Sequence, residues 1–272
     1  MNGFVWLIWI AVIIGIIFWA WGGFRKQKLA KLRAKNAMKK LSEEDWGFLE
    51  EHVRIATMIP EELKERFEQI IQVLVGEKNF EACGELEEVT REMKIVVMAQ
   101  AALLLLGRKH DFFPDLRSVL IYPDAYQGKG KDGEDQTRLG ESWDSGSVVL
   151  SWRSVWKGGE NPEDGHNVVI HEFAHQLDQE NDRADGLPVL RDRKAIGKWA
   201  HAFSGAFEGF CRDLDAGRRT VMDPYGATNP AEFFSVATEC FFEKAEQLEK
   251  EHPPLYQHCL LYTSPSPRDG SE

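Results

Sequence analysis

The chain has 272 residues, of which 43% are hydrophobic and 11% aromatic. This length and composition fit one substantial globular domain with a small appendage, and they exclude a chain that is disordered throughout. The formal net charge of -11 argues against direct nucleic-acid binding, because nucleic acids are bound by a basic face.

The four cysteines, Cys83, Cys211, Cys240 and Cys259, form no CxxC pair. This spacing supports neither a disulfide framework nor a zinc site built from thiolates. We therefore expect isolated thiols in a reducing compartment.

Residues 1–24 contain no charged side chain. The run from Phe4 to Trp21 would form a helix of about 27 Å, close to the thickness of a bilayer core. Tryptophans lie near both ends of the run, as is typical of membrane interfaces. A cleaved signal peptide would need a basic start and a cleavage site between small residues, and neither is clear. The sequence therefore predicts one transmembrane helix at 1–24.

Basic residues begin abruptly at Arg25, and eight of them lie within residues 25–40. A buried core helix would not explain this change, so we interpret 25–40 as a basic juxtamembrane stalk. No cation other than the amino terminus precedes the apolar run. The positive-inside rule then predicts a single-pass protein of the inner (cytoplasmic) membrane with the body of the protein in the cytoplasm. A cytosolic protein is the alternative.

Residues 41–258 form the main predicted domain. The stretch "LSEEDW" at 41–46 predicts a helix start with Ser42 as the N-cap. Helices are expected from there to about residue 107, including 59–75 and a buried central helix at 91–107. Two β-branched segments, 118–123 and 146–152, predict strands, and the second is interpreted as an edge strand that could bind an extended peptide. The polar, glycine-rich segment 128–141 between them predicts a mobile loop near the site.

Further helices are expected at about 166–180, 191–215 and 230–247. The predicted fold class is therefore α+β: a mainly helical domain with a small β-sheet, preceded by one transmembrane helix. The stretch "CLLYTSPSPRD" at 259–269 resembles the translation of a sequencing adapter. We expect the natural sequence to stop near His258 and residues 259–272 to be a non-native tail; a disordered Ser/Pro-rich tail is the alternative.

The segment "HEFAHQLD" at 171–178 carries the chemistry. On a helix, His171 and His175 project from one face one turn apart, which suits a Zn²⁺ ion bound by two imidazole nitrogens. Glu172 lies beside that face, where it could take a proton from water as a general base. The pattern HExxH alone is weak, but two histidines on a core-facing stripe are costly to bury unless something satisfies them.

A zinc site needs a third protein ligand. A metzincin would supply a histidine at position 181, where this chain has Asn181. Three acids compete instead: Asp178, Glu232 and Glu239. Asp178 is on the same helix and is better suited to an outer position, whereas Glu232 and Glu239 share one face of the helix at 230–247. Glu232 could also be part of a capping box at the start of that helix.

Four segments, "HNVVIHEFAHQLD", "DGLPVL", "DPYGATNPAEFFSVATECFFE" and "VLIYPDAY", together resemble the zinc-dependent peptidase family of Mlc titration factor A, over about residues 40–258. That family is similar to the catalytic domain of anthrax lethal factor, so the resemblance implies a zincin-like fold. It implies His171, His175 and Glu232 as zinc ligands and Glu172 as the general base. It also implies that Tyr225 assists at the transition state.

The resemblance implies a zinc metallopeptidase that acts on a peptide or protein substrate, with a leaning towards aminopeptidase activity. An alternative from the same resemblance is a protein that sequesters a transcriptional repressor, with proteolysis secondary. A third hypothesis is a structural metal site, closed by Asp178 as a fourth ligand.

Overall fold

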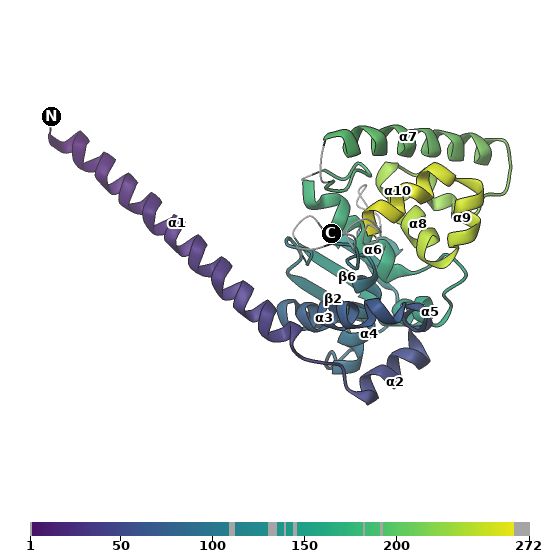
Figure 1. The fold of residues 1–272 in the computed structure, drawn as a ribbon, viewed down its shortest axis with the longest axis horizontal. Helices are drawn as coiled ribbons and strands as arrows, with labels where there is room; N and C mark the ends of the chain where they lie inside the picture. The colour runs from purple at the N-terminus through teal and green to yellow at the C-terminus, as the bar shows by residue number, and fades with distance from the viewer. Residues whose placement is uncertain are drawn as a thin grey trace.

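The computed structural model describes residues 2–108, 112–129, 135–138, 140–143, 146–181, 183–190 and 193–263. A long N-terminal helix projects from a body of helices packed around a small sheet (Figure 1). The helices are α1 (Asn2–Ala37), α2 (Glu43–His52), α3 (Glu61–Glu77), α4 (Arg91–Leu103), α5 (Trp152–Glu160), α6 (Val168–Asp178), α7 (Arg193–Asp215), α8 (Pro230–Glu243), α9 (Ala245–Glu251) and α10 (Pro253–Thr263). The strands are β1 (Asn79–Ala82), β2 (Ser118–Tyr122), β3 (Tyr126–Lys129), β4 (Asp135–Arg138), β5 (Gly140–Trp143) and β6 (Ser147–Ser151). The fold is thus a mainly helical α+β domain.

The main sheet has the order β1-β2-β6-β5. Strands β1, β2 and β6 are parallel, and β5 runs antiparallel to β6. The prediction that the strand at 146–152 lies at an edge is therefore wrong, because β6 pairs with β2 on one side and β5 on the other. The strands at the two ends of this order are β1 and β5, and β5 is the one that packs against α6.

The segment 128–141, predicted as a loop, contains strands wherever it is described. β3 and β4 pair as an antiparallel ladder, with Lys129 opposite Asp135. β5 takes its extended conformation from its neighbour, since Glu141 pairs with Val149 of the buried strand β6. Polar strands of this kind have no apolar alternation, which is why their sequence reads as a loop. Residues 130–134 and 139 lie outside the described residues.

The predicted helices agree closely with the observed ones. Ser42 caps α2 through a capping box: its hydroxyl accepts from the N–H of Asp45, and the Asp45 carboxylate accepts from the N–H of Ser42. The predicted central helix is α4, whose residues from Ile95 to Leu103 are buried. It packs against α3 on one side and α6 on the other. These contacts place α6 at the centre of the domain, between α4, α8 and the sheet.

Helix α1 joins the predicted anchor and the predicted basic stalk in one element. Its C-terminal part packs on α3, where Nε and Nη2 of Arg33 donate to the Glu77 carboxylate at 2.6 and 3.0 Å. The predicted span at 1–24 falls partly on residues 1–8 and 11, whose side chains lie outside the description. Within the described part of the chain, no helix combines the length and apolar character needed to cross a membrane.

At the other end of the chain, α10 passes His258 and continues to Thr263. Cys259 is 5% exposed and packs in the hydrophobic core. The expectation that the natural sequence stops near His258 stays a prediction, and residues 264–272 lie outside the described residues.

Candidate metal centre

Helix α6 presents two histidine rings to one region. The helix begins after Asn167, whose side-chain oxygen accepts from the N–H of Ile170 at 3.1 Å. Burial of the apolar residues of α6 fixes the helix in the core. The rings of His171 and His175 have centroids 5.0 Å apart and planes at 79°. Each side chain is 14% exposed, so both rings are nearly covered but still reach the surface.

Helix α8 supplies the third group. Asn229 caps this helix by accepting from the N–H of Glu232 at 3.0 Å. The Glu232 side chain does not turn back to the cap: its Oε2 lies 3.0 Å from Nε2 of His171 and 3.2 Å from Nε2 of His175. Asn229 therefore caps α8 through the backbone of Glu232, but the predicted capping box is not formed, because the Glu232 carboxylate belongs to the cluster.

The ligand atoms of His171, His175 and Glu232 all lie within 4.8 Å of one another, and they form a metal-competent group among the described residues. Two imidazoles and one carboxylate are the donor set of catalytic zinc sites that keep a fourth position open. The residues present therefore fit a zinc ion. Zinc as the bound metal remains a proposal.

The electrostatics of the cluster follow from its acids. Burial opposes protonation of His171, but the carboxylates of Glu239 and Glu232 outweigh it and hold the pKa of His171 well above its usual value. Burial likewise opposes ionisation of Glu232, yet hydrogen bonds from the two histidines hold the pKa of Glu232 far below its usual value. The cluster therefore favours a positive charge among its carboxylates, which is the charge that a bound metal ion would supply.

The other two candidates for the third ligand lie elsewhere. Oδ2 of Asp178 accepts from the N–H of Gly186 at 2.9 Å, and burial raises the pKa of Asp178 to about 6. This carboxylate anchors the loop after α6. The Glu239 carboxylate lies behind His171, 2.8 Å from its Nδ1 rather than at Nε2. The geometry thus brings Glu232, and neither rival, to the face shared by the two Nε2 atoms.

Glu172 lies beside the cluster and is 6% exposed. Burial raises the pKa of Glu172, and the carboxylates of Glu232 and Glu239 raise it further, while the two histidines lower it. Space for its carboxylate comes from Gly140, at the start of the edge strand β5. A Cβ atom at position 140 would fall 2.6 Å from Oε1 of Glu172 and 2.7 Å from Cγ2 of Val168. Sequence reasoning missed Gly140, whose only signal was a glycine in a polar segment.

Replacing Gly140 with alanine is expected to lower kcat about 100-fold, because the added methyl group pushes the Glu172 carboxylate from its place. Metal content should not change, since position 140 contacts no donor atom of the cluster. The matched control is Gly47→Ala on α2, where a Cβ meets nothing within 4 Å. Steady-state peptide hydrolysis with metal analysis checks the prediction. Wild-type turnover in the Gly140 variant would contradict it.

Tyr225 lies on a short 3-10 helix, η3 (Pro224–Ala227), immediately before α8. Asp223 caps this turn by accepting from the N–H of Tyr225 at 2.7 Å. The Tyr225 side chain is 55% exposed, and its ring centroid is 6.1 Å from that of His171. The structure therefore places the exposed ring of Tyr225 beside His171.

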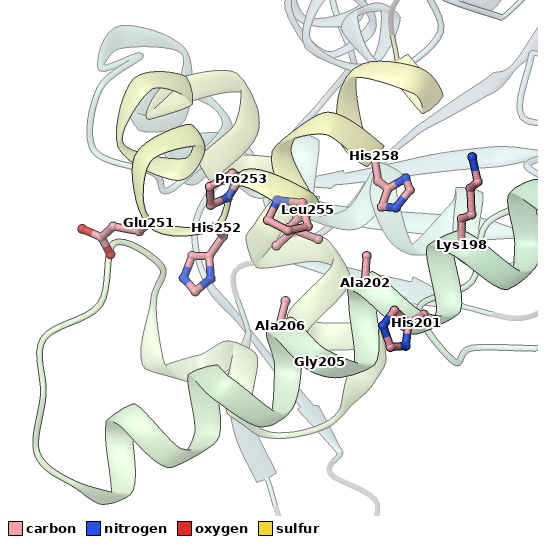
Figure 2. A pocket seen from close by; sticks show the side chains of 11 residues that line it. Lys198, His201, Ala202, Gly205, Ala206, Glu251, His252, Pro253, Leu255 and His258 are labelled. Carbon is pink, nitrogen blue, oxygen red and sulfur yellow. The ribbon is translucent and has the colours of Figure 1, made fainter.

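A cavity of about 550 Å³ lies apart from this cluster, between α7 and the α9–α10 corner (Figure 2). Its charged and polar lining is formed by Lys198, His201, Glu251, His252 and His258. None of the residues that line it belongs to the His171–His175–Glu232 cluster. His201, His252 and His258 therefore line this cavity and are not part of the candidate metal centre.

Comparison with known proteins finds a matching family and several similar proteins. The family described as glucose-regulated metallo-peptidase M90 matches residues 24–262. An uncharacterized protein of Synechocystis, slr2042, is 35% identical over 263 residues, which cover 93% of this chain and 94% of that protein. Mlc titration factor A of Yersinia pestis (strain Pestoides F) is 32% identical over 184 residues, or 63% of this chain and 66% of that protein. The same identity and coverage hold for Mlc titration factor A of Yersinia pseudotuberculosis serotype O:3.

Proposed function

Because this chain belongs to the M90 family of glucose-regulated metallopeptidases, we propose that it hydrolyses peptide bonds at a zinc ion held by His171, His175 and Glu232. The observation that carries the proposal is the meeting of two Nε2 atoms and one carboxylate oxygen within 4.8 Å, on two helices that the core holds together. Three protein ligands leave a position open for substrate, as in catalytic zinc sites.

The protein groups around that position have distinct tasks. A zinc ion bound there supplies Lewis acidity to the scissile carbonyl and lowers the pKa of water. The Glu172 carboxylate accepts a proton from the attacking water and then delivers it to the amine that leaves. The buried position of this carboxylate next to His171 suits both transfers.

The experiment that tests the proposal measures metal content and cleavage of unstructured peptides by the full chain. One zinc per chain together with hydrolysis that stops on chelation and returns with zinc is the expected result. Metal-free protein that cleaves at the same rate would contradict it. Comparing free and N-blocked peptides separates the aminopeptidase type of activity, which rests on the family resemblance, from endopeptidase activity.

Tyr225 is proposed to donate a hydrogen bond to the oxyanion that develops during attack. The exposure of its side chain next to His171 supports this role. Tyr225→Phe is expected to lower kcat by roughly 10²-fold with little change in KM, because only the transition state loses a hydrogen bond. Metal content should stay at the wild-type value. A rise in KM at constant kcat would instead indicate a role in substrate binding.

A second candidate function is binding of a transcriptional repressor. It is favoured by the similarity to Mlc titration factor A of Yersinia, a protein named for titrating Mlc. In this proposal the chain sequesters a regulator, and proteolysis is secondary. Pull-down of the purified repressor from the same organism with the Glu172→Gln variant tests it; absence of binding at micromolar concentrations of both proteins would count against it.

Attachment to the inner membrane is a further part of the proposal. Along α1, large apolar side chains from Trp9 to Phe24 are exposed, including Trp19 at 82% and Phe18 at 66%, and the basic residues start at Arg25. Insertion of this surface in the bilayer would cover it and would leave the catalytic domain on the cytoplasmic side. Membrane fractionation with an alkaline wash tests the attachment; protein recovered entirely in the supernatant would favour a cytosolic enzyme.

A further inference from the structure

Glu239 makes contacts that none of the roles above requires. It is on α8, about two turns after Glu232, and is 6% exposed. Its Oε2 lies 2.8 Å from Nδ1 of His171, and its Oε1 accepts from the backbone N–H of Asn167 at 2.7 Å. Both carboxylate oxygens therefore have a partner on α6. One partner is the histidine ring itself and the other is the residue that starts its helix.

Both ring nitrogens of His171 lie within hydrogen-bond distance of a carboxylate oxygen: Nδ1 faces that of Glu239 and Nε2 faces that of Glu232. A carboxylate oxygen only accepts hydrogen bonds, so a neutral ring that binds a metal through Nε2 would carry its hydrogen on Nδ1, where Glu239 accepts it. The lone pair is then on Nε2, the atom that faces His175 and Glu232. A ligand imidazole whose other nitrogen donates to a carboxylate is fixed in tautomer and orientation, and its basicity rises.

The second contact controls where the ring lies. Asn167 is the N-cap of α6 and is one turn before His171, whose N–H donates to the Asn167 carbonyl at 2.9 Å. By bonding the N–H of Asn167 and the ring of His171 together, the Glu239 carboxylate fixes the first turn of α6 against α8. Since α8 also carries Glu232, this contact sets the distance between the two ligand-bearing helices.

We propose that Glu239 is a positioning residue of the metal centre: it orients His171 and selects its tautomer from behind, without binding the metal. This inference rests on the proposed function, because it assigns a role towards the ion held by His171, His175 and Glu232. It also gives the third acid of the sequence hypothesis a role different from that of a ligand.

Glu243 offers a matched control on the same helix. It is 7% exposed, its Oε2 accepts from the N–H of His166 at 3.1 Å, and its Oε1 accepts from Nδ2 of Asn167 at 3.1 Å. Glu243 thus bonds to the same start of α6 as Glu239 does, but within the described residues its carboxylate bonds to His166 and Asn167 and to no histidine ring of the cluster. A merely structural role in joining α8 to α6 would be shared by both residues, whereas a role in orienting His171 belongs to Glu239 alone.

The test measures the zinc dissociation constant of the full chain by competition with a chromogenic chelator, for wild type, Glu239→Ala, Glu239→Gln and Glu243→Gln. Thermal unfolding of each metal-free variant shows whether it folds. We expect Glu239→Ala to bind zinc 10- to 100-fold more weakly, the range typical of losing a group that hydrogen-bonds to a metal-binding histidine. Glu239→Gln should lie between wild type and Glu239→Ala, because one amide oxygen can still accept from Nδ1. Glu243→Gln should bind zinc as wild type does, whatever its unfolding temperature.

The visible spectrum of the cobalt-substituted protein adds a readout that does not depend on activity. The ligand-field bands should shift in the Glu239 variants and stay unchanged in Glu243→Gln. Equal zinc affinity in wild type and Glu239→Ala would overturn the positioning role while leaving the proposed function intact, as would equal weakening by Glu239→Gln and Glu243→Gln. Wild-type protein that binds no zinc would overturn the proposed function and this inference with it.

Discussion

Glu172→Gln is expected to retain the metal and to lower kcat by about 10²- to 10⁴-fold, the range that general acid–base catalysis contributes. The substitution keeps the size of the side chain but removes its ability to accept the proton of the attacking water. KM should change little, since the loss falls on the transition state. Metal analysis and steady-state kinetics on the same preparation measure both quantities.

The matched control for this prediction is Glu163→Gln, at an exposed position just before α6. This change should leave kcat and metal content as they are in wild type. A Glu172→Gln variant with more than a tenth of wild-type kcat would remove the general-base role. A variant that lost its metal would instead show that Glu172 contributes to the cluster itself.

Glu232→Ala is expected to lose both metal and activity. Among the described residues, the substitution removes the one carboxylate that lies against both Nε2 atoms, and two histidines alone do not complete a catalytic zinc site. We expect the zinc affinity to fall by more than the 10- to 100-fold typical of losing a group that only hydrogen-bonds to a metal ligand. The Asn229 cap uses the backbone of residue 232, so α8 should remain folded, and circular dichroism checks this.

Two variants separate the possible results. Glu249→Ala, at an exposed position of α9, should keep zinc and activity. Asp178→Ala should unfold at a lower temperature, since it releases the loop held at Gly186, but should keep a bound metal. Retention of zinc by Glu232→Ala with loss of zinc by Asp178→Ala would transfer the third-ligand role to Asp178.

Local patterns in the sequence predicted the helices well. The N-cap at Ser42, the apolar run of α4 and the spacing of His171 and His175 are each set by residues within one or two turns of each other. The reason for this success is physical: helical hydrogen bonds and caps are local, so a short window contains the information.

Features that depend on pairing between distant residues were predicted less well. The order of the sheet was missed, because β5 is a strand only through its partner β6, and no alternation marks it. Before the family resemblance was considered, the residues alone left the third ligand open among three acids, for the same reason. Asp178, Glu232 and Glu239 differ in what they contact across the α6–α8 interface, and the sequence of either helix alone does not contain that contact.

The close approach of Glu172 to Gly140 also affects how related chains should be judged. The motif HExxH predicts a histidine pair and a glutamate on one helix. It does not predict the residues of the strand that packs against the glutamate, which is β5 in this chain. A chain that keeps the motif and carries a larger side chain at the position of Gly140 would have to move the base or the strand, since even a Cβ falls 2.6 Å from Oε1 of Glu172. Such a chain is a candidate for a metal-binding protein without hydrolytic activity, and a single position outside the motif identifies it.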